Sequence, residues 1–434
     1  GNTVTIEADE FSRNDSPEGN VSFYAAVKNL NDEYSACSSL NDISGTYVNS
    51  HLAEEGDACA ADSDCLSGFC RTSTNLCVDI DDQLLAIGDD FTCFAINGSP
   101  KCFGKNNHGQ LGNGNTTDTY TPGDVKDTSG NSLTNIIQLS AGEQHACALN
   151  TSGEIYCWGK GAPNLYADSN PADKNQGAVK IQGITATKIS TATNYTCAVS
   201  EDSDLICWGN NANHSMGGSG PYATPTLLID DNIVDVKTSE YFSCFRYNDD
   251  TIRCMGGNLK SQTGRNPIDT ITTLNEISAL TNMSDQTIFA ESFDIGNKTG
   301  CFTDDQGDAH CWGGNGKRQF GADLGTSRSY RSRQSQLSGA TVDQVSVGLM
   351  FSCFLLEDHT VKCAGRNTAG QLGRGTTSNS EDPPDSVQNL ADITLIEAGF
   401  THSCAFDVDN KIHCWGDNSS SQISDTILNS WTTP

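Results

Sequence analysis

Residues 140–159 read SAGEQHACALNTSGEIYCWG and carry in one stretch the pattern that decides the fold. Two short apolar runs flank the turn at 151–153, which predicts a β-hairpin. Cys147 and Cys157 stand equally far from the turn centre, so they face each other across the antiparallel pair. Cβ atoms of such residues lie about 4.5–5.5 Å apart, which is close enough for a disulfide after modest adjustment. We therefore expect a cystine-bridged hairpin.

The same cysteine pair recurs seven times along the chain. The pairs are Cys93 and Cys102, Cys147 and Cys157, Cys197 and Cys207, Cys244 and Cys254, Cys301 and Cys311, Cys353 and Cys363, and Cys404 and Cys414. Six pairs are ten residues apart and the first is nine, and the first cysteines recur every 47 to 57 residues. A period of this size indicates a solenoid, propeller or array. We predict one bridge within each hairpin, and bridges between neighbouring repeats are the alternative.

Further residue columns accompany the cysteines. A glycine stands two residues after every second cysteine, at Gly104, Gly159, Gly209, Gly256, Gly313, Gly365 and Gly416. It suits a position where backbones crowd near an axis or where φ is positive. The residue before it is Trp in four repeats, which has the size to fill the space between two sheets. One strand is predicted before each hairpin and one after it, and four strands make a propeller blade.

With these columns aligned, the chain resembles the regulator-of-chromosome-condensation repeat family. The resemblance covers about residues 83–434 and is clearest at 140–159 and at 104–114, which reads GKNNHGQLGNG. It implies a seven-bladed propeller. It does not carry over the nucleotide exchange and chromatin binding of the nuclear member, because fold does not fix function and this chain is acidic and cystine-rich. Secreted members, which include a bacterial β-lactamase inhibitor and plant receptor ectodomains, bind proteins or serve as surface modules.

We therefore predict an all-β, seven-bladed β-propeller with a small N-terminal strand and a cystine-rich extension. Residues 1–50 form an extended or β arm, residues 51–80 a small cystine-rich motif, and residues 81–434 the propeller. The blades are expected to start near residues 83, 134, 185, 232, 288, 341 and 392. Either residues 427–431 or the N-terminal segment supplies the last outer strand.

Five cysteines precede the repeats. For the small motif we prefer a bridge of Cys59 with Cys70 and one of Cys65 with Cys77, one of three connectivities. Cys37 is then the odd cysteine. It either pairs inside the N-terminal region through a different connectivity or forms an intermolecular bridge in an assembly.

Charge and cysteine content limit the compartment and the partners. Acidic residues number 55 and basic residues 25, a formal net charge of −30, which repels nucleic acid and anionic membranes. No apolar run approaches the roughly 18 residues of a spanning helix, so no membrane insertion is predicted. Nineteen cysteines without a C-x-x-C zinc pair indicate an oxidising environment. We expect a secreted or cell-surface protein, and a start at Gly1 fits an exported product whose signal has been removed.

One segment is basic against this acidic background. Five of the 25 basic residues lie in 317–333, which we predict to be an interface formed by Lys317, Arg318, Arg328, Tyr330, Arg331 and Arg333. Arg and Tyr are favoured at interfaces. The hairpin turns of five repeats are acidic instead, and they are expected to form a negative ring on one side, with solubility as the alternative reason. The basic segment of one copy could meet the acidic turns of another.

No catalytic constellation is visible. His145 and His402 share a column with aromatic residues, which indicates packing. Residues 407–410 and 79–82 resemble the start of a calcium loop but lack its later Gly and Glu, and Asp and Asn are ordinary turn residues. We predict no cofactor, with Ca²⁺ as a weak alternative. Candidate N-glycosylation sites are Asn14, Asn20, Asn97, Asn115, Asn150, Asn194, Asn213, Asn282, Asn297 and Asn418.

These patterns favour a non-enzymatic extracellular structural or assembly protein, a subunit of a surface appendage, filament or layer. Its subunits would contact one another through the N-terminal arm, which could pair with a partner strand, and through propeller loops. The partner is a protein, either copies of itself or another surface protein. The alternatives are a secreted monomeric binding module, such as an inhibitor or receptor ectodomain, and a hydrolase with its site at the propeller axis.

Overall fold

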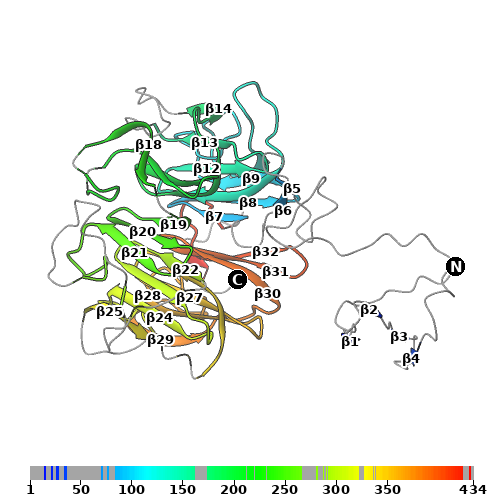
Figure 1. Ribbon diagram of the computed structural model, residues 1–434, viewed down its shortest axis with the longest axis vertical. Coiled ribbons are helices and arrows are strands. Elements are labelled where there is room, and N and C mark those ends of the chain that lie inside the picture. The colour runs from blue at the N-terminus through cyan, green and yellow to red at the C-terminus, as the bar shows by residue number, and fades with distance from the viewer. Residues whose placement is uncertain are drawn as a thin grey trace. The chain divides into compact units, whose positions relative to one another are not determined.

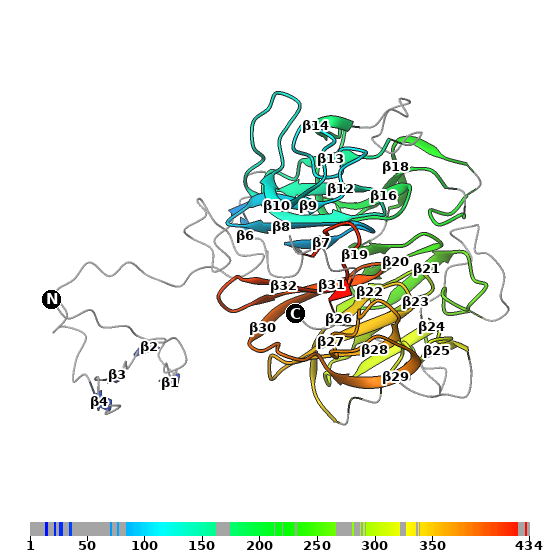
Figure 2. The same cartoon turned by 180° about the vertical axis from the view of Figure 1, so that it is seen from behind.

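The computed structural model is all-β, and Figures 1 and 2 show it from opposite sides. It describes short strands before residue 80, then residues 84–423 and 430–431, except 162–173, 212, 219, 231, 266–279, 282–286, 288–289, 291, 322–326, 336 and 338. Within this part of the chain no helix is long and apolar enough to cross a membrane. The chain divides into two units, Gly1–His51 and Leu52–Pro434.

Seven antiparallel sheets follow one another along the second unit and surround an axis, as predicted (Figure 1). In each blade the first strand lies innermost and the strands run outward in sequence order. Blade 1 holds β7 (Leu85–Ile87), β8 (Phe91–Ile96), β9 (Ser99–Gly104) and β10 (Thr119–Asp124); blade 2 holds β11 (Ile136–Ala141), β12 (His145–Asn150), β13 (Ile155–Gly159) and β14 (Lys174–Lys180); blade 3 holds β15 (Ala186–Thr191), β16 (Tyr195–Ser200), β17 (Leu205–Gly209) and β18 (Tyr222–Ile229).

The remaining blades repeat this order. Blade 4 shows β19 (Ile233–Thr238), β20 (Phe242–Tyr247) and β21 (Ile252–Gly256) among its described residues; blade 5 holds β22 (Ser292–Ile295), β23 (Thr299–Thr303), β24 (Ala309–Gly314) and β25 (Arg328–Gln334); blade 6 holds β26 (Val342–Val347), β27 (Phe351–Leu356), β28 (Val361–Asn367) and β29 (Ser378–Ser386); blade 7 holds β30 (Ile393–Ala398), β31 (His402–Asp407), β32 (Ile412–Asp417) and β33 (Ser430–Trp431). Each inner strand thus begins close to its predicted blade start.

Each blade carries its own disulfide across the central hairpin. The two cysteines of a pair lie directly opposite each other in the strand register, and all seven Cα–Cα distances are 4.1 Å. In blade order, Cys93 bonds to Cys102, Cys147 to Cys157, Cys197 to Cys207, Cys244 to Cys254, Cys301 to Cys311, Cys353 to Cys363, and Cys404 to Cys414. The bridges therefore join strands of one blade and not neighbouring blades. The period of two along a strand places both sulfurs on one buried face.

Two glycine columns have different physical causes. Gly159 ends β13 with φ +106°, and a Cβ there would lie 2.6 Å from the Gln144 carbonyl. The whole column after the second cysteine is left-handed in the same way, so positive φ, not closeness to the axis, selects it. A second column, five residues before the first cysteine, approaches the next blade instead. A Cβ on Gly142 would lie 2.2 Å from the Ala192 carbonyl of blade 3.

Tryptophans seal the contacts between blades. Trp158, Trp208, Trp312 and Trp415 are fully buried. Trp158 packs in one apolar cluster with Leu111 and Val125 of blade 1. Its Nε1 also donates to the Gln110 carbonyl at 2.9 Å, and Trp312 and Trp415 make the same bond to Gln262 and Gln371. The predicted filling of the space between sheets is thus accompanied by a polar link.

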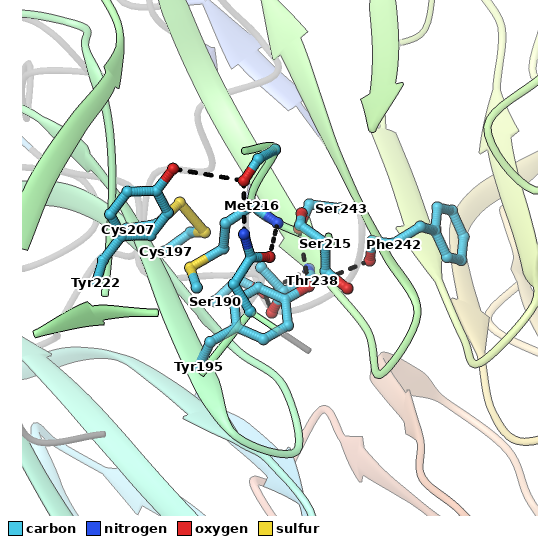
Figure 3. The surroundings of a disulfide bond; sticks show 12 residues. Ser190, Tyr195, Cys197, Cys207, Ser215, Met216, Tyr222, Thr238, Phe242 and Ser243 are labelled. Carbon is cyan, nitrogen blue, oxygen red and sulfur yellow. Dashed lines mark hydrogen bonds between the residues drawn. A yellow bond between two sulfur atoms is a disulfide. The ribbon is translucent and has the colours of Figure 1, made fainter. Parts of the chain in front are cut away.

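Polar side chains join blades 3 and 4 beside the bridge of Cys197 with Cys207 (Figure 3). The Tyr195 hydroxyl donates to the Ser239 carbonyl at 2.8 Å and lies 2.8 Å from the Ser243 hydroxyl. Because Tyr195 is 3% exposed, these partners satisfy a hydroxyl that burial would otherwise penalise.

The ring closes without exchanging strands between its ends. β33, from the C-terminal segment, pairs with β32 and completes blade 7, which settles which end supplies the last outer strand. An apolar cluster that includes Leu85, Phe94 and Phe406 joins blade 7 to blade 1. The Thr92 hydroxyl adds hydrogen bonds of 2.9 Å to His402 Nε2 and to the Gln422 carbonyl.

Residues before the propeller form three short strand pairs. β1 (Asn14–Asp15) pairs with β2 (Val21–Ser22), β3 (Ala26–Lys28) with β4 (Tyr34–Ala36), and β5 (Cys70–Arg71) with β6 (Leu76–Cys77). Residues 37, 59 and 65 lie outside the described residues, so the bridges of Cys59 with Cys70 and of Cys65 with Cys77, and the role of Cys37, stay predictions.

Candidate functional site

The loop that follows the third strand is braced from within in six of the seven blades. The side chain of an Asn at the loop start accepts the backbone N–H five residues later, as Asn315 does from Phe320 at 3.0 Å. A Gln four residues after the Asn accepts the N–H two residues before itself, as Gln319 does from Lys317 at 2.8 Å. Six repeats carry the Asn brace and five carry the Gln brace. Side chains between the two are therefore presented on a fixed backbone.

These braced loops present cations on blades 4 and 5. We define the basic patch as Leu259, Lys260, Lys298, Lys317, Arg318 and Arg328. Lys260 stands in the brace of blade 4 and Lys317 in that of blade 5, each with its N–H held by the Gln two residues on. Lys298 lies on the turn between β22 and β23. Residues from three loops thus converge on one end of the strands.

Direct contacts hold the patch together. Arg328 Nη1 donates to the Leu259 carbonyl at 3.3 Å, which links blade 5 to blade 4. A Cβ on Gly314 would lie 3.5 Å from Lys298 Cβ and 3.7 Å from Lys260 Cβ, so these lysines flank the same glycine. The Lys298 ammonium lies 4.9 Å from the Tyr241 ring centroid, a cation–π distance. Leu259 is 72% exposed, the most exposed large apolar side chain among the described residues.

The structure divides the predicted basic segment in two. Arg328 lies at the patch end of β25, opposite Gly314, whereas Arg333 lies opposite Cys311 in mid-strand. Arg331 and Arg333 are half-buried on the outer edge of blade 5, and the Arg331 guanidinium lies 5.1 Å from the Tyr330 ring centroid. Lys317, Arg318 and Arg328 therefore share a surface, and Tyr330, Arg331 and Arg333 form a separate edge.

Sequence reasoning missed Leu259, Lys260 and Lys298. A signal for one of them was present, because Lys260 and Lys317 occupy the same column, two residues after the Asn of consecutive repeats. Consecutive repeats are neighbouring blades in a propeller, so a shared column means spatial proximity. Lys298 lies on a different loop, and only the fold brings it to the patch.

The acidic hairpin turns lie at the other end of the strands. Turn carbonyls accept the N–H that opens the next inner strand, as Gly307 does from Val342 at 2.9 Å. Glu201, Asp202, Asp249, Asp250, Asp305, Glu357, Asp358 and Asp409 are exposed there. The turns and the basic patch therefore face opposite sides of the disc.

Other acidic residues of these turns shape the hairpin. Asp304 Oδ1 accepts the N–H groups of Gln306 and Asp308 at 3.1 and 2.9 Å, and its Oδ2 contacts His310 Nε2 at 2.8 Å. Together with Asp308 and His310 it forms a convergent group of metal-ligand type among the described residues. The local hydrogen bonds account for this group, so it assigns no metal.

The structure describes one of the two candidate calcium segments, residues 407–410. Asp407 Oδ1 accepts the N–H groups of Asp409 and Lys411 at 3.0 and 2.9 Å, and the Lys411 ammonium contacts Asp409 at 2.9 Å. These contacts define an ordinary hairpin turn. Residues 79–82 lie outside the described part of the chain, so that segment stays untested.

The two column histidines are buried packing residues. His145 and His402 are 1% and 0% exposed, and burial lowers the pKa of each to about 3. Both therefore stay neutral in the folded protein at ordinary pH. His402 Nε2 contacts Thr92 across the ring closure at 2.9 Å.

The sequons differ in accessibility. Asn97 and Asn115 are exposed. Asn418 is 2% exposed, and its side chain braces the last loop by accepting the Ile423 N–H at 3.0 Å. The Asn418 side chain is therefore not accessible in the folded protein, and glycosylation at all ten sequons stays a prediction.

Known sequences share the repeat. Sequence profiles of the regulator of chromosome condensation (RCC1) repeat match residues 102–149, 342–371, 359–406 and 393–422. The human E3 ubiquitin-protein ligase HERC2 is 25% identical over 334 residues, which cover 74% of this chain and 7% of that protein. The human probable E3 ubiquitin-protein ligase HERC6 is 26% identical over 195 residues, covering 44% and 19%. The chain thus spans under a fifth of the length of these relatives.

Solved structures share the fold. Yeast RCC1 (Prp20), solved with Kap60 bound, superposes with a TM-score of 0.63 and 16% identity over 92% of this chain and 89% of that one. Human WBSCR16 gives 0.62 and 14% over 76% and 87%. At this identity the likeness concerns fold alone. The chain thus carries RCC1 repeats at residues 102–149 and 342–422, set in a seven-bladed propeller with a cystine-bridged hairpin in each blade.

Proposed function

We propose that this chain is a non-enzymatic, extracellular assembly protein whose propeller binds acidic surfaces of other subunits through the basic patch. The subunit is a second copy of the chain or another surface protein. Seven buried disulfides support an oxidising compartment. Together with the repeat, they support a durable surface component more than an intracellular regulator.

One observation carries the proposal. A chain of net charge −30 gathers Lys260, Lys298, Lys317, Arg318 and Arg328 around the exposed Leu259 at one end of its blades, and exposes acidic turns at the other end. The complementary charges of the basic patch and the acidic hairpin turns favour head-to-tail contact. Contacts of this heterologous type build open filaments or layers when they do not close into a ring.

The comparisons support protein binding in general. The solved structures of Prp20 concern its complex with Kap60 and its binding to Gsp1p and histones. These partners belong to that protein. For the present chain, the charge pattern supports an acidic protein surface as the partner.

Neutralisation of the patch tests the proposal. Lys260→Gln, Lys317→Gln and Arg328→Gln together should abolish assembly of the purified chain, measured by light scattering after size exclusion and by electron microscopy under non-reducing conditions. High ionic strength should dissolve the wild-type assembly, because exposed charges are screened beyond about a Debye length.

A matched control carries the same change in net charge elsewhere. Lys101→Gln, Lys180→Gln and Lys411→Gln remove three exposed cations away from the patch and should assemble as the wild type does. A wild-type chain that stays a 46.2 kDa monomer at all concentrations would overturn self-assembly and favour the monomeric binding module. Equal loss in both triple variants would overturn the role of the patch.

A further inference from the structure

The inner strands of all seven blades surround a cavity of about 130 Å³ on the propeller axis, the axial cavity. One residue column, seven positions before each first cysteine, runs around it: Ala86, Ser140, Ser190, Lys237, Asp294, Ser346 and Glu397. All of these except Ser346 line the cavity. Side chains far apart in sequence therefore meet at one level of the axis.

The neutral members of this column link neighbouring blades. Each serine hydroxyl accepts an N–H from the next inner strand: Thr191 N to Ser140 at 2.9 Å, Thr238 N to Ser190 at 2.9 Å and Ala398 N to Ser346 at 2.8 Å. Asp294 does the same through Oδ2, which accepts the Val347 N–H at 2.6 Å. A hydroxyl suffices for this structural role, so a charged residue is not needed for it.

Lys237 and Glu397 depart from the pattern. An ammonium cannot accept an N–H, so Lys237 cannot make the link. Among the described residues, none donates a hydrogen bond to the Glu397 carboxyl, which faces the cavity. Glu397 does interact electrostatically with Asp294 and with Lys237. The axis thus holds two carboxyls and one ammonium at the same level.

This group carries more negative than positive charge. With both carboxyls ionised, Asp294 and Glu397 outnumber Lys237 by one charge. Glu240 also lines the cavity, after the end of β19, where its Oε2 accepts the Asn297 amide at 2.8 Å. Burial, followed by repulsion from Asp294, raises the pKa of Glu397 to about 8. Burial also raises the pKa of Asp294. The two coupled carboxyls therefore favour a protonated form of the pair at neutral pH, because burial penalises the second negative charge.

We propose that the axial cavity binds one small monovalent cation, inorganic or a primary ammonium, between the carboxyls of Glu397 and Asp294. Ser190 and Thr238 line the same cavity, and their hydroxyls, which hydrogen-bond to each other at 3.0 Å, are the neutral oxygen atoms available there. The positive charge of Lys237 disfavours a divalent ion. Asp294 and Glu397 also do not belong to the group of three metal-ligand side chains found among the described residues. With both carboxyls ionised, the described residues at this level leave a deficit of one charge, which either a proton or a monovalent cation neutralises.

The proton balance follows directly. Entry of the cation ionises the carboxyl pair of Asp294 and Glu397, and the proton leaves to the buffer. At pH 7 each cation bound should therefore release close to one proton. Proton release is measured separately from assembly. The proposal for the axial cavity and the proposal for the basic patch can therefore be refuted independently.

Calorimetry and thermal unfolding of the full chain test the site. Sodium, potassium, ammonium and methylammonium chlorides are titrated in phosphate and in HEPES, both neutralised with tetrabutylammonium hydroxide. We expect saturable binding with proton release and a rise in Tm for at least one of these cations. Differences among the four distinguish an inorganic ion from an ammonium ligand.

Substitution at Glu397 completes the test. Glu397→Gln should weaken binding by roughly tenfold or more, the usual effect of losing a charged contact, and should reduce the proton release. Glu397→Ser introduces the residue type that this column already holds at Ser140 and Ser190. The variant should therefore fold, and it should weaken cation binding as Glu397→Gln does. Glu357→Gln, on an exposed turn, should bind as the wild type does. Absence of binding by all four cations, tighter binding of Ca²⁺ than of any of them, or unchanged binding in both Glu397 variants would overturn the proposal.

Discussion

Acid should destabilise this propeller through two buried histidines. His145 and His402 have a pKa of about 3 in the folded chain, against 6.5 for an ordinary histidine. Because the folded pKa is depressed, the unfolded chain binds protons first as the pH falls below 6.5, and stability is lost from there towards pH 3. Replacing one histidine by Phe should remove its share of this loss.

The magnitude follows from linkage. Each pH unit below the unfolded pKa removes about 1.4 kcal/mol per histidine. Between pH 7 and pH 5 the loss is therefore about 2 kcal/mol for His145 and about the same for His402. Phe is a fitting replacement, since Phe91, Phe242 and Phe351 occupy the same column. His145 also makes no hydrogen bond through Nε2 to any described residue, so His145→Phe leaves no partner of that atom unsatisfied.

Urea unfolding with disulfides intact, followed by tryptophan fluorescence at pH 7, 6 and 5, measures the effect. The free energy of unfolding of His145→Phe should exceed that of the wild type by about 2 kcal/mol more at pH 5 than at pH 7. His402→Phe should show the same pH effect, with a constant loss added because the Thr92 hydroxyl loses one of its two partners. Parallel pH profiles for wild type and His145→Phe would refute the reasoning.

Three further outcomes are expected. Cys353→Ser with Cys363→Ser should lower the free energy of unfolding by roughly 2–3 kcal/mol, since a short loop is freed; urea midpoints measure it, and an unchanged midpoint contradicts it. Gly159→Ala should lower Tm, because φ is +106° and the new Cβ meets a carbonyl at 2.6 Å; a Tm equal to wild type refutes it. Glu397→Gln should make stability fall less between pH 5 and pH 8 in tetrabutylammonium buffer. The pKa of Glu397 in the folded chain, about 8, lies above its ordinary 4.5. This carboxyl therefore lowers the free energy of unfolding as the pH rises. Identical pH slopes for the wild type and the variant would count against this reasoning.

The blade count and the hairpin bridges could be predicted because they depend on local geometry. A cysteine pair such as Cys147 and Cys157, centred on a turn, fixes the register of two strands by itself. Seven repeats of the pair, 47 to 57 residues apart, then predict seven equivalent sheets. The Asn and Gln columns have the same origin, since each brace closes within five residues of chain.

The basic segment was predicted only in part. Proximity in sequence grouped Arg331 and Arg333 with Lys317, but strand direction carries these arginines away from Arg328 along β25. Proximity in sequence also could not find Lys298, which reaches the patch from another loop. Asn418 shows the converse, because its sequon is intact in sequence while its side chain is buried as a brace.

Sequence alone determined the repeat and the acidic balance of the chain, and it predicted the disulfide pairing within blades that the structure confirms. Only the tertiary structure decided that β33 closes the ring, that cations of blades 4 and 5 meet at Leu259, and that Lys237, Asp294 and Glu397 share the axis. The physical reason is the separation along the chain between the groups that interact. Hydrogen bonds within a hairpin or a loop are set by neighbours along the chain, whereas charges from different blades interact only after the blades close around a common centre.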